Sequence, residues 1–130
     1  MNSEQVNMAV AKLLGWTDIE EKTYWLEDYY DISEVTGLEG VPKGSNTRRL
    51  IPDYCHDLNA AMATAGQKLK GISIQQSDDL VGISWEDQGG EWHVMNPFSD
   101  PDFSRTAAKV CEAILQAHGV TVASEQEGGK

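Results

Sequence analysis

The sequence predicts an α+β fold in which three helices pack with a three-stranded antiparallel meander. Apolar residues recur at helical spacing in three segments. Between the second and the third of these segments, the chain has three short runs in which apolar and polar residues alternate. A chain of 130 residues is long enough for one hydrophobic core. We therefore expect a single domain over residues 1–119, with an acidic, aromatic insert at 17–49 and a loosely held polar tail at 120–130.

The first helix is expected close to the N-terminus. Its single apolar stripe consists of Val6, Ala9, Val10, Leu13 and Leu14. Gly15 can end the helix, and we expect Trp16 to fold back onto the core. Residues 1–10 lack the basic start and apolar centre of a signal peptide, so a cytoplasmic protein is expected.

The periodicity of residues 17–49 does not indicate one structure. The aromatic run at 23–30 fits a strand or a short helix. Glycines and Pro42 are frequent over residues 37–49, which predicts an irregular loop there.

The second helix is predicted to begin near Pro52, a favourable residue for a first turn, with Asp53 close to the positive end of the helix dipole. Gly71 is expected to end it. Its apolar stripe contains Leu58, Ala61, Met62, Ala65 and Leu69.

The meander is predicted over residues 72–76, 80–85 and 91–96, which two polar turn segments separate. One face should pack against the helices, whereas the opposite face is mixed in polarity. The residues that alternate onto the packed face are Ile72, Ile74, Val81, Ile83, Trp85, Trp92 and Val94.

The third helix is expected over residues 103–118, capped by Asp102 or Ser104 and ended by Gly119. Cys55 and Cys111 fall in the second and third predicted helices. Two buried thiols in a reducing compartment are expected there, and a disulfide bond between them is the alternative. The predicted core consists of Val10, Leu14, Leu58, Met62, Ile83, Trp85, Ile114 and Leu115.

The formal net charge of −11 is concentrated in two segments. Residues 17–39 and 77–103 each carry a net charge of −7, and a small basic segment with Lys43, Arg48 and Arg49 follows the first. Clustered acids disfavour direct binding to nucleic acid and favour a partner with a basic surface. Acidity that serves only solubility is the alternative. No apolar run approaches the roughly 20 residues that span a bilayer, so no membrane partner is expected.

Four blocks of the sequence together resemble a known family. They are VNMAVAKLLGW at 6–16, IPDYCHDLNAAM at 51–62, the strand around Trp92, and TAAKVCEAILQAHG at 106–119. In this order they are similar to the phage ABA-sandwich domain proteins, small proteins of phages and prophages with no assigned activity. The resemblance implies a helix–sheet–helix (ABA) sandwich and a phage origin, and it carries no catalytic residues. The insert at 17–49 is longer than the resemblance implies.

Two segments suggest a chemical function. Asp53, His56 and Asp57 suit a divalent ion and hence a small metal-dependent hydrolase, although ligands from other elements would be needed. The structural alternative is that Asp53 caps a helix, Asp57 or His56 bonds a neighbouring backbone group, and Tyr54 packs. The loop at 37–49 suits an anion such as a nucleotide signal, or it is a plain connector. We expect no catalytic residue, no metal site and no cofactor.

Aromatic residues surrounded by charge are typical of a protein-binding surface. We therefore expect a non-enzymatic phage protein that binds and modulates a host protein in the host cytoplasm. The specific version is an anti-defence inhibitor whose acidic surface mimics nucleic acid. The predicted partner-binding residues are Asp18, Glu20, Glu21, Trp25, Glu27, Asp28, Tyr29, Asp31, Asp78, Asp79, Glu86 and Asp87.

Overall fold

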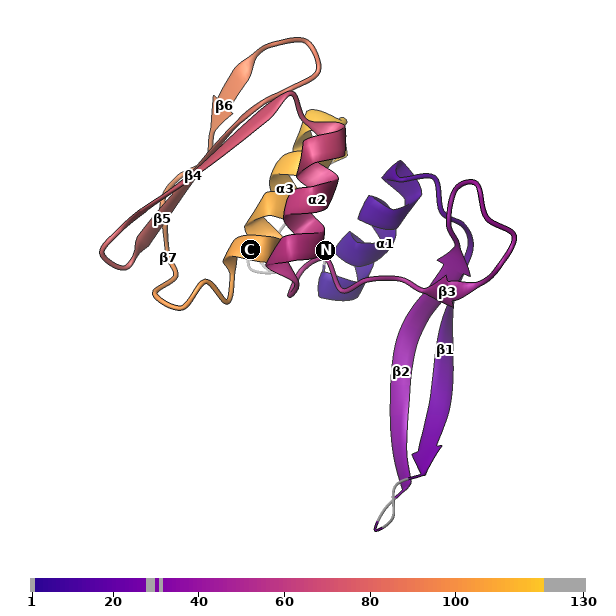
Figure 1. Ribbon diagram of the computed structural model, residues 1–130. Helices are drawn as coiled ribbons and strands as arrows, with labels where there is room; N and C mark the ends of the chain where they lie inside the picture. Colours follow the sequence, from indigo (N-terminus) through magenta and orange to yellow (C-terminus); the bar gives the residue numbers. More distant parts are fainter. Residues whose placement is uncertain (1, 28–29, 31, 121–130) are drawn as a thin grey trace, which may run out of the picture. The chain divides into compact units, whose positions relative to one another are not determined.

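A computed structural model of the chain describes residues 2–27, 30 and 32–120 (Figure 1). This part of the chain is α+β, with three helices and two antiparallel sheets of three and four strands. In chain order the elements are α1 (Ser3–Leu13), β1 (Thr17–Glu27), β2 (Ile32–Val41), β3 (Arg49–Leu50), α2 (Leu58–Lys68), β4 (Gly71–Ser77), β5 (Leu80–Glu86), β6 (Trp92–Val94), β7 (Phe98–Ser99) and α3 (Thr106–Ala117).

The chain divides into two compact units. The helical unit consists of residues 1–10 and 52–130, and the hairpin unit consists of residues 11–51. The hairpin unit therefore contains the whole of the predicted insert at 17–49. The predicted tail at 120–130 lies outside the described residues, except for its first residue.

The sheet of the helical unit has the strand order β4-β5-β6, and β7 also pairs with β5. Helices α2 and α3 pack against each other on one side of this sheet, where α2 contacts β4 and α3 contacts β5 (Figure 1). The core of the unit lies between these layers. Its buried residues include Val81, Ile83, Trp85, Val110, Ile114 and Leu115. The α+β class is confirmed, whereas the helix–sheet–helix sandwich around a three-stranded meander is not.

The third strand of the predicted meander is divided into β6 and β7. Met95 still donates its backbone N–H to the carbonyl of Ile83 (2.9 Å), but Pro97 has no N–H to continue the ladder, and pairing resumes at Phe98. The register also differs from the prediction. Trp85 pairs with His93, so Trp92 and Val94 face away from the helices and are 56% and 80% exposed. Their predicted place in the packed face is wrong, because a shift of one residue turns every side chain of a strand to the other face.

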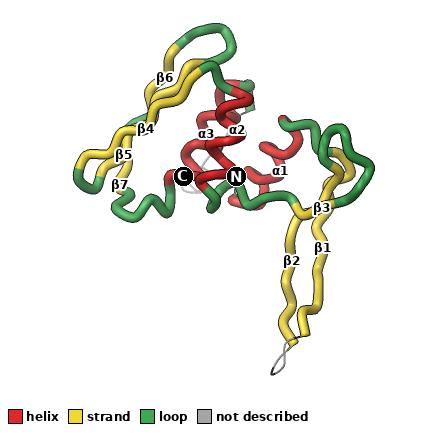
Figure 2. The backbone as a smooth tube through the Cα atoms, in the orientation of Figure 1, coloured by secondary structure: helices red, strands yellow, loops and turns green. Residues whose placement is uncertain are grey.

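The first turns of α2 and α3 begin later than the sequence predicts. Residues 51–57 run as a loop and turn before α2 (Figure 2), and Asp57, not Asp53, caps this helix by accepting the N–H of Ala60 (3.1 Å). The helix ends at Lys68, and Gly71 already belongs to β4. The prediction that α2 starts near Pro52 is wrong, because the backbone from 52 to 56 is held by turn hydrogen bonds instead.

The start of α3 is organised by Asp100. Its carboxylate accepts hydrogen bonds from the backbone N–H of Arg105 (2.9 Å) and from the hydroxyl of Thr106 (2.6 Å). Phe103, at the predicted start, has a positive φ of 61° and is exposed. Asp102 and Ser104 therefore do not cap α3 as predicted, whereas Gly119 (φ 78°) follows its end as expected.

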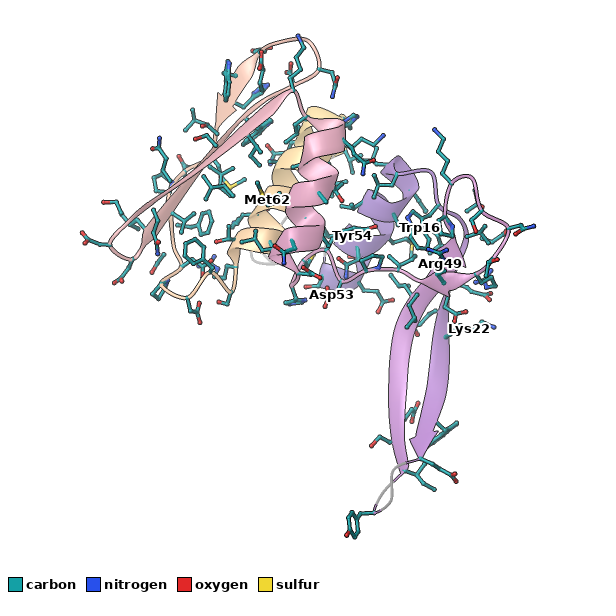
Figure 3. All side chains as sticks on the ribbon, viewed as in Figure 1. Trp16, Lys22, Arg49, Asp53, Tyr54 and Met62 are labelled. Carbon is teal, nitrogen blue, oxygen red and sulfur yellow. The ribbon has the colours of Figure 1, made fainter. Side chains whose placement is uncertain are left out.

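The predicted core is confirmed for Val10, Ile83, Trp85, Ile114 and Leu115, which are buried. Leu14, Leu58 and Met62 are only half-buried, so the prediction that they lie in the buried core is wrong. Met62 is labelled in Figure 3. Trp16 is also half-buried, and its ring approaches the backbone at Gly40 of β2, where a Cβ atom would lie 3.3 Å away. The same Cβ atom would lie 3.1 Å from Ile19 and 3.1 Å from the backbone carbonyl of Thr17, so a side chain at position 40 would force these neighbours to shift.

The hairpin unit is built around a long antiparallel pair of β1 and β2. Thr, Ile and Trp residues of β1 favour an extended backbone, which decides the ambiguous run at 23–30 in favour of a strand through Glu27. β2 continues through Gly37 and Gly40 to Val41, so the irregular loop predicted over 37–49 is restricted to residues 42–48. β3 pairs only with Glu39 and Gly40. We call residues 20–27 and 32–39, which pair with each other throughout, the arm.

Candidate functional site

The register of the arm separates its side chains into two faces. Glu21 lies opposite Leu38, Trp25 opposite Glu34, and Glu27 opposite Ile32, so these residues share one face. Thr23 and Thr36 belong to the same face, and their hydroxyls are 3.2 Å apart. We call this face, with Glu21, Thr23, Trp25, Glu27, Ile32, Glu34, Thr36 and Leu38, the acidic face.

Ion pairs within the hairpin unit neutralise the opposite face of the arm. Glu20 lies 3.3 Å from the ammonium of Lys22 and 3.1 Å from the guanidinium of Arg48, and Arg48 also approaches Glu39 at 3.6 Å. Lys22 is labelled in Figure 3, as is Arg49, which pairs with Gly40 and so lies on the other side of the sheet from these ion pairs. The charges of this face are therefore largely matched inside the protein.

The eight residues of the acidic face include no cation and are exposed except for Leu38, while Arg49 of β3, which pairs with Gly40, lies on the same side of the sheet. Trp25 is 67% exposed and Ile32 is 57% exposed, and Glu21, Glu27 and Glu34 are exposed around them. Among the described residues, none of these three glutamates forms an ion pair. Large aromatic rings are enriched in protein interfaces, and unpaired carboxylates attract basic groups.

The structure sorts the predicted partner-binding residues of the first acidic segment. Glu21, Trp25 and Glu27 come together on the acidic face, whereas Glu20 belongs to the ion-paired face. Asp18 lies at the irregularity of β1, with a φ of 52°. Asp28, Tyr29 and Asp31 lie outside the described residues.

The second acidic segment belongs to the helical unit, and its predicted residues do not form one patch. Asp78 and Asp79 occupy the turn before β5, and Glu86 and Asp87 occupy its other end. At about 3.3 Å per residue, β5 separates the two pairs by roughly 20 Å. The acidic residues of this segment therefore lie in two separate places, one at each end of β5.

Asp87 belongs to a cluster with Glu91 and His93 at the turn between β5 and β6. One ligand atom from each side chain lies within 4.8 Å of the others. Asp87 Oδ2 is 2.8 Å from His93 Nε2, and Asp87 Oδ1 accepts the N–H groups of Gly89 (2.9 Å) and Glu91 (3.0 Å). The hydrogen bond from His93 is the main cause that lowers the pKa of Asp87 below its ordinary value.

This cluster is not among the sites that the sequence predicts. Asp87, Glu91 and His93 are close in the sequence, but only the pairing of Trp85 with His93 places the imidazole beside the turn. The sequence does show a polar turn segment followed closely by a histidine, which could have indicated the cluster. The predicted register of the third strand placed His93 on the opposite face of the sheet, so the two were not connected.

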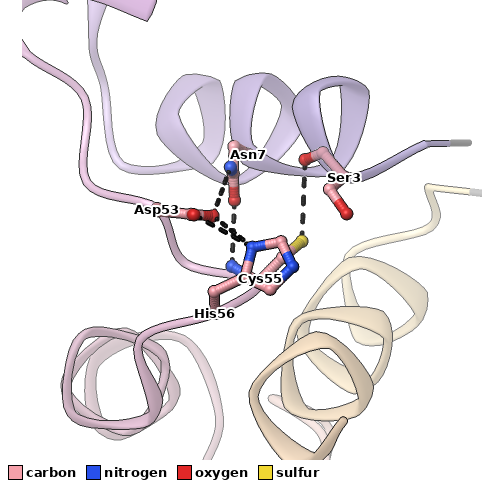
Figure 4. Close-up of polar contacts among 5 residues, drawn as sticks. All are labelled: Ser3, Asn7, Asp53, Cys55 and His56. Carbon is pink, nitrogen blue, oxygen red and sulfur yellow. Dashed lines mark hydrogen bonds and ion pairs between the residues drawn. The ribbon is translucent and has the colours of Figure 1, made fainter. Parts of the chain in front are cut away.

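The segment 53–57 forms a structural network (Figure 4). Asp53 accepts a hydrogen bond from Asn7 Nδ2 (2.9 Å) and lies 2.9 Å from His56 Nδ1, while Asn7 Oδ1 accepts the N–H of Cys55 (3.0 Å). Burial raises the pKa of Asp53, but the hydrogen bonds from Asn7 and His56 outweigh it, so the pKa lies below the ordinary value. Asp57 caps α2, and among the described residues no third ligand joins Asp53 and His56. The geometry gives no support to the hydrolase alternative.

Cys55 and Cys111 are free and buried, and Cys55 Sγ donates a hydrogen bond to the carbonyl of Ser3 (3.6 Å, Figure 4). The interaction between the two thiols lowers the pKa of Cys55 and raises the pKa of Cys111, and burial raises the pKa of Cys111 further. Cys55 lies in the turn before α2, so its predicted place in a helix is wrong. The two buried thiols are confirmed.

The cations of the segment 37–49 are partly engaged within the hairpin unit. Arg48 pairs with Glu20 and Glu39, and the aliphatic chain of Lys43 lies against Gly15. Gly37 and Gly40 belong to β2, which leaves Gly44 as the glycine of the loop. The arrangement resembles a connector more than a cradle for an anion.

The comparisons with known proteins identify no relative: no family model, curated protein or solved structure matches this chain. Within the described residues, no helix is both long and apolar enough to cross a membrane.

Proposed function

We propose that this chain is a non-enzymatic binding protein whose acidic face docks onto a basic surface of a partner protein. The observation that carries the proposal is the position of the exposed Trp25 among Glu21, Glu27 and Glu34, none of which forms an ion pair with another described residue. Such a face attracts a basic partner at a distance, and the exposed indole supplies an anchor once contact is made.

The form of the arm also favours a binding role. Beyond its short pairing with β3, the arm is a two-stranded ribbon. A two-stranded hairpin is marginally stable in water by itself, and burying a large apolar side chain contributes about 1.5–3 kcal/mol. A partner that covers Trp25 would therefore stabilise the arm as it binds.

The resemblance to phage proteins extends this proposal. The partner would be a host protein in the host cytoplasm, and the acidic face would take the place of nucleic-acid phosphates in a basic groove. The proposed activity is inhibition of a defence protein of the host, whose nucleic-acid-binding groove the acidic face would occupy. The exposed acids of the arm and the matched charges on its other face support this version.

The test is a matched pair of charge reversals. The variant E21K/E27K changes the acidic face, and D78K/D79K makes the same change in net charge at the β4–β5 turn of the helical unit. The wild-type chain is used to isolate a basic partner from host lysate, and binding of the purified partner is then measured for each variant. We expect E21K/E27K to weaken binding by at least about tenfold and D78K/D79K to change it little. Equal weakening by both variants would contradict the proposal, because it would show a response to net charge alone.

Trp25→Ala provides a second measurement on the same partner. The dissociation rate should increase while the association rate changes little, because anchor residues act mainly after the encounter. Trp92→Ala removes another exposed tryptophan, which belongs to the helical unit, and serves as the control. An unchanged dissociation rate for Trp25→Ala would exclude the acidic face as the contact.

A further inference from the structure

The cluster of Asp87, Glu91 and His93 takes no part in the acidic face of the arm and has a chemistry of its own. It combines two carboxylates and one imidazole, and its three ligand atoms lie within 4.8 Å of one another. In a tetrahedral zinc site with bonds of about 2.0–2.1 Å, neighbouring ligand atoms are about 3.3 Å apart. The three ligand atoms are therefore no more than about 1.5 Å from the spacing that a zinc site requires.

The histidine of the cluster is fixed by packing. The ring of His93 stacks on Trp85 with a centroid distance of 5.4 Å and an interplanar angle of 21°. Trp85 is buried, and it pairs with His93 across β5 and β6. The imidazole is thus held by the core of the helical unit, with Nε2 directed at Asp87.

The first carboxylate is fixed by the backbone of the turn. The N–H groups of Gly89 and Glu91 hold Asp87 Oδ1, which leaves Oδ2 at the side of His93. Gly90 has a φ of 87°, which lets the turn close around Asp87. Glu91 is exposed, so its side chain can rotate toward the other two ligands.

We propose that Asp87, Glu91 and His93 bind one zinc ion at the β5–β6 turn. A mixed set of imidazole and carboxylate suits zinc, whereas calcium and magnesium prefer sites made of oxygen alone. Three protein ligands from one turn leave a fourth position for water or for a group of a bound molecule. The site is local to residues 85–93 of the helical unit.

The test is a titration of the full chain, freed of metal with a chelator, with zinc chloride. Calorimetry should show one zinc ion per chain, and NMR should show a change in the imidazole signals of His93. Glu91→Gln should weaken zinc binding by at least about tenfold. Because Glu91 is exposed, this variant keeps its fold even where His93→Ala loses the stacking on Trp85.

His56→Ala is the matched control, because His56 also pairs with an aspartate but no third ligand joins them among the described residues. It should bind zinc as tightly as the wild type. The proposal would be overturned if Glu91→Gln bound zinc as tightly as the wild type. It would also be overturned if zinc bound without changing the NMR signals of His93. Absence of zinc binding would mean that the Asp87–His93 pair only closes the turn.

Discussion

At the scale of single residues, Asp100 shows how one carboxylate determines where a helix begins. It is 1% exposed and accepts hydrogen bonds from the hydroxyl of Thr106, the N–H of Arg105 and the hydroxyl of Ser104. Burial raises the pKa of Asp100, but these hydrogen bonds together outweigh it and hold the pKa below the ordinary value of 3.8. The ionised form is therefore the one that the fold stabilises.

The pH dependence of this contribution has a definite sign. Because the pKa of Asp100 is lower in the folded state, its contribution is present above pH 3.8 and is lost as the pH falls through the folded pKa. Asp100→Asn should lower the urea midpoint at pH 7, and its difference from the wild type should shrink below pH 3.8. Asp78→Asn is the control, because Asp78 is an exposed aspartate of the β4–β5 turn and is not among the groups that interact with Asp100. A difference that stays constant with pH would show that the charge of Asp100 does not matter.

At the scale of elements, hydrogen bonds between side chains and backbone connect segments that are distant in sequence. Asn7 of α1 bonds both the carboxylate of Asp53 and the buried N–H of Cys55. At the other end of α2, His118 Nε2 lies 2.8 Å from the carbonyl of Lys68. The Asn7 contacts fix the turn that precedes α2, and the His118 contact reaches a carbonyl of the last turn of α2, which has no partner within the helix.

Asn7→Ala should lower the free energy of unfolding by about 1–3 kcal/mol, because it leaves the buried N–H of Cys55 without its acceptor. His56→Ala removes only an exposed ion pair with Asp53 and should cost no more than about 1 kcal/mol. Chemical denaturation of both variants checks this difference. Equal costs would place the stabilisation in the Asp53–His56 pair instead.

At the scale of the whole molecule, the surplus of negative charge is divided between the two compact units. Residues 17–39 belong to the hairpin unit and residues 77–103 to the helical unit. In the hairpin unit the acids of one face are matched by Lys22 and Arg48, which leaves the acidic face as the unmatched part. The distribution of charge, rather than its total, is what suits a particular partner.

The association rate with a basic partner should fall steeply as salt is added. The Debye length shrinks from about 10 Å at 0.1 M to about 3 Å at 1 M, which removes attraction at a distance. Stopped-flow or surface-based kinetics over this range measures the effect, and E21K/E27K should show a shallower salt dependence than the wild type. An association rate that does not change with salt would contradict the proposal and would indicate that the acidic residues serve only solubility.

The sequence by itself determined the class of fold, the three helices and much of the core. The apolar stripes around Val10 and Leu115 and the alternation of Ile83 and Trp85 are local patterns whose period matches the secondary structure. Gly15 and Gly119 ended their helices as expected, because both adopt a positive φ that other residues avoid.

Only the tertiary structure decided which side chains of the hairpins share a face. The register of β6 depends on how the turn at 87–91 closes, and the two faces of the arm depend on the pairing of β1 with β2. Pairing between strands joins residues that no local period connects, and a slip of one residue would exchange the faces. The acidic face around Trp25 and the cluster around His93 therefore became visible only once these pairs were in place.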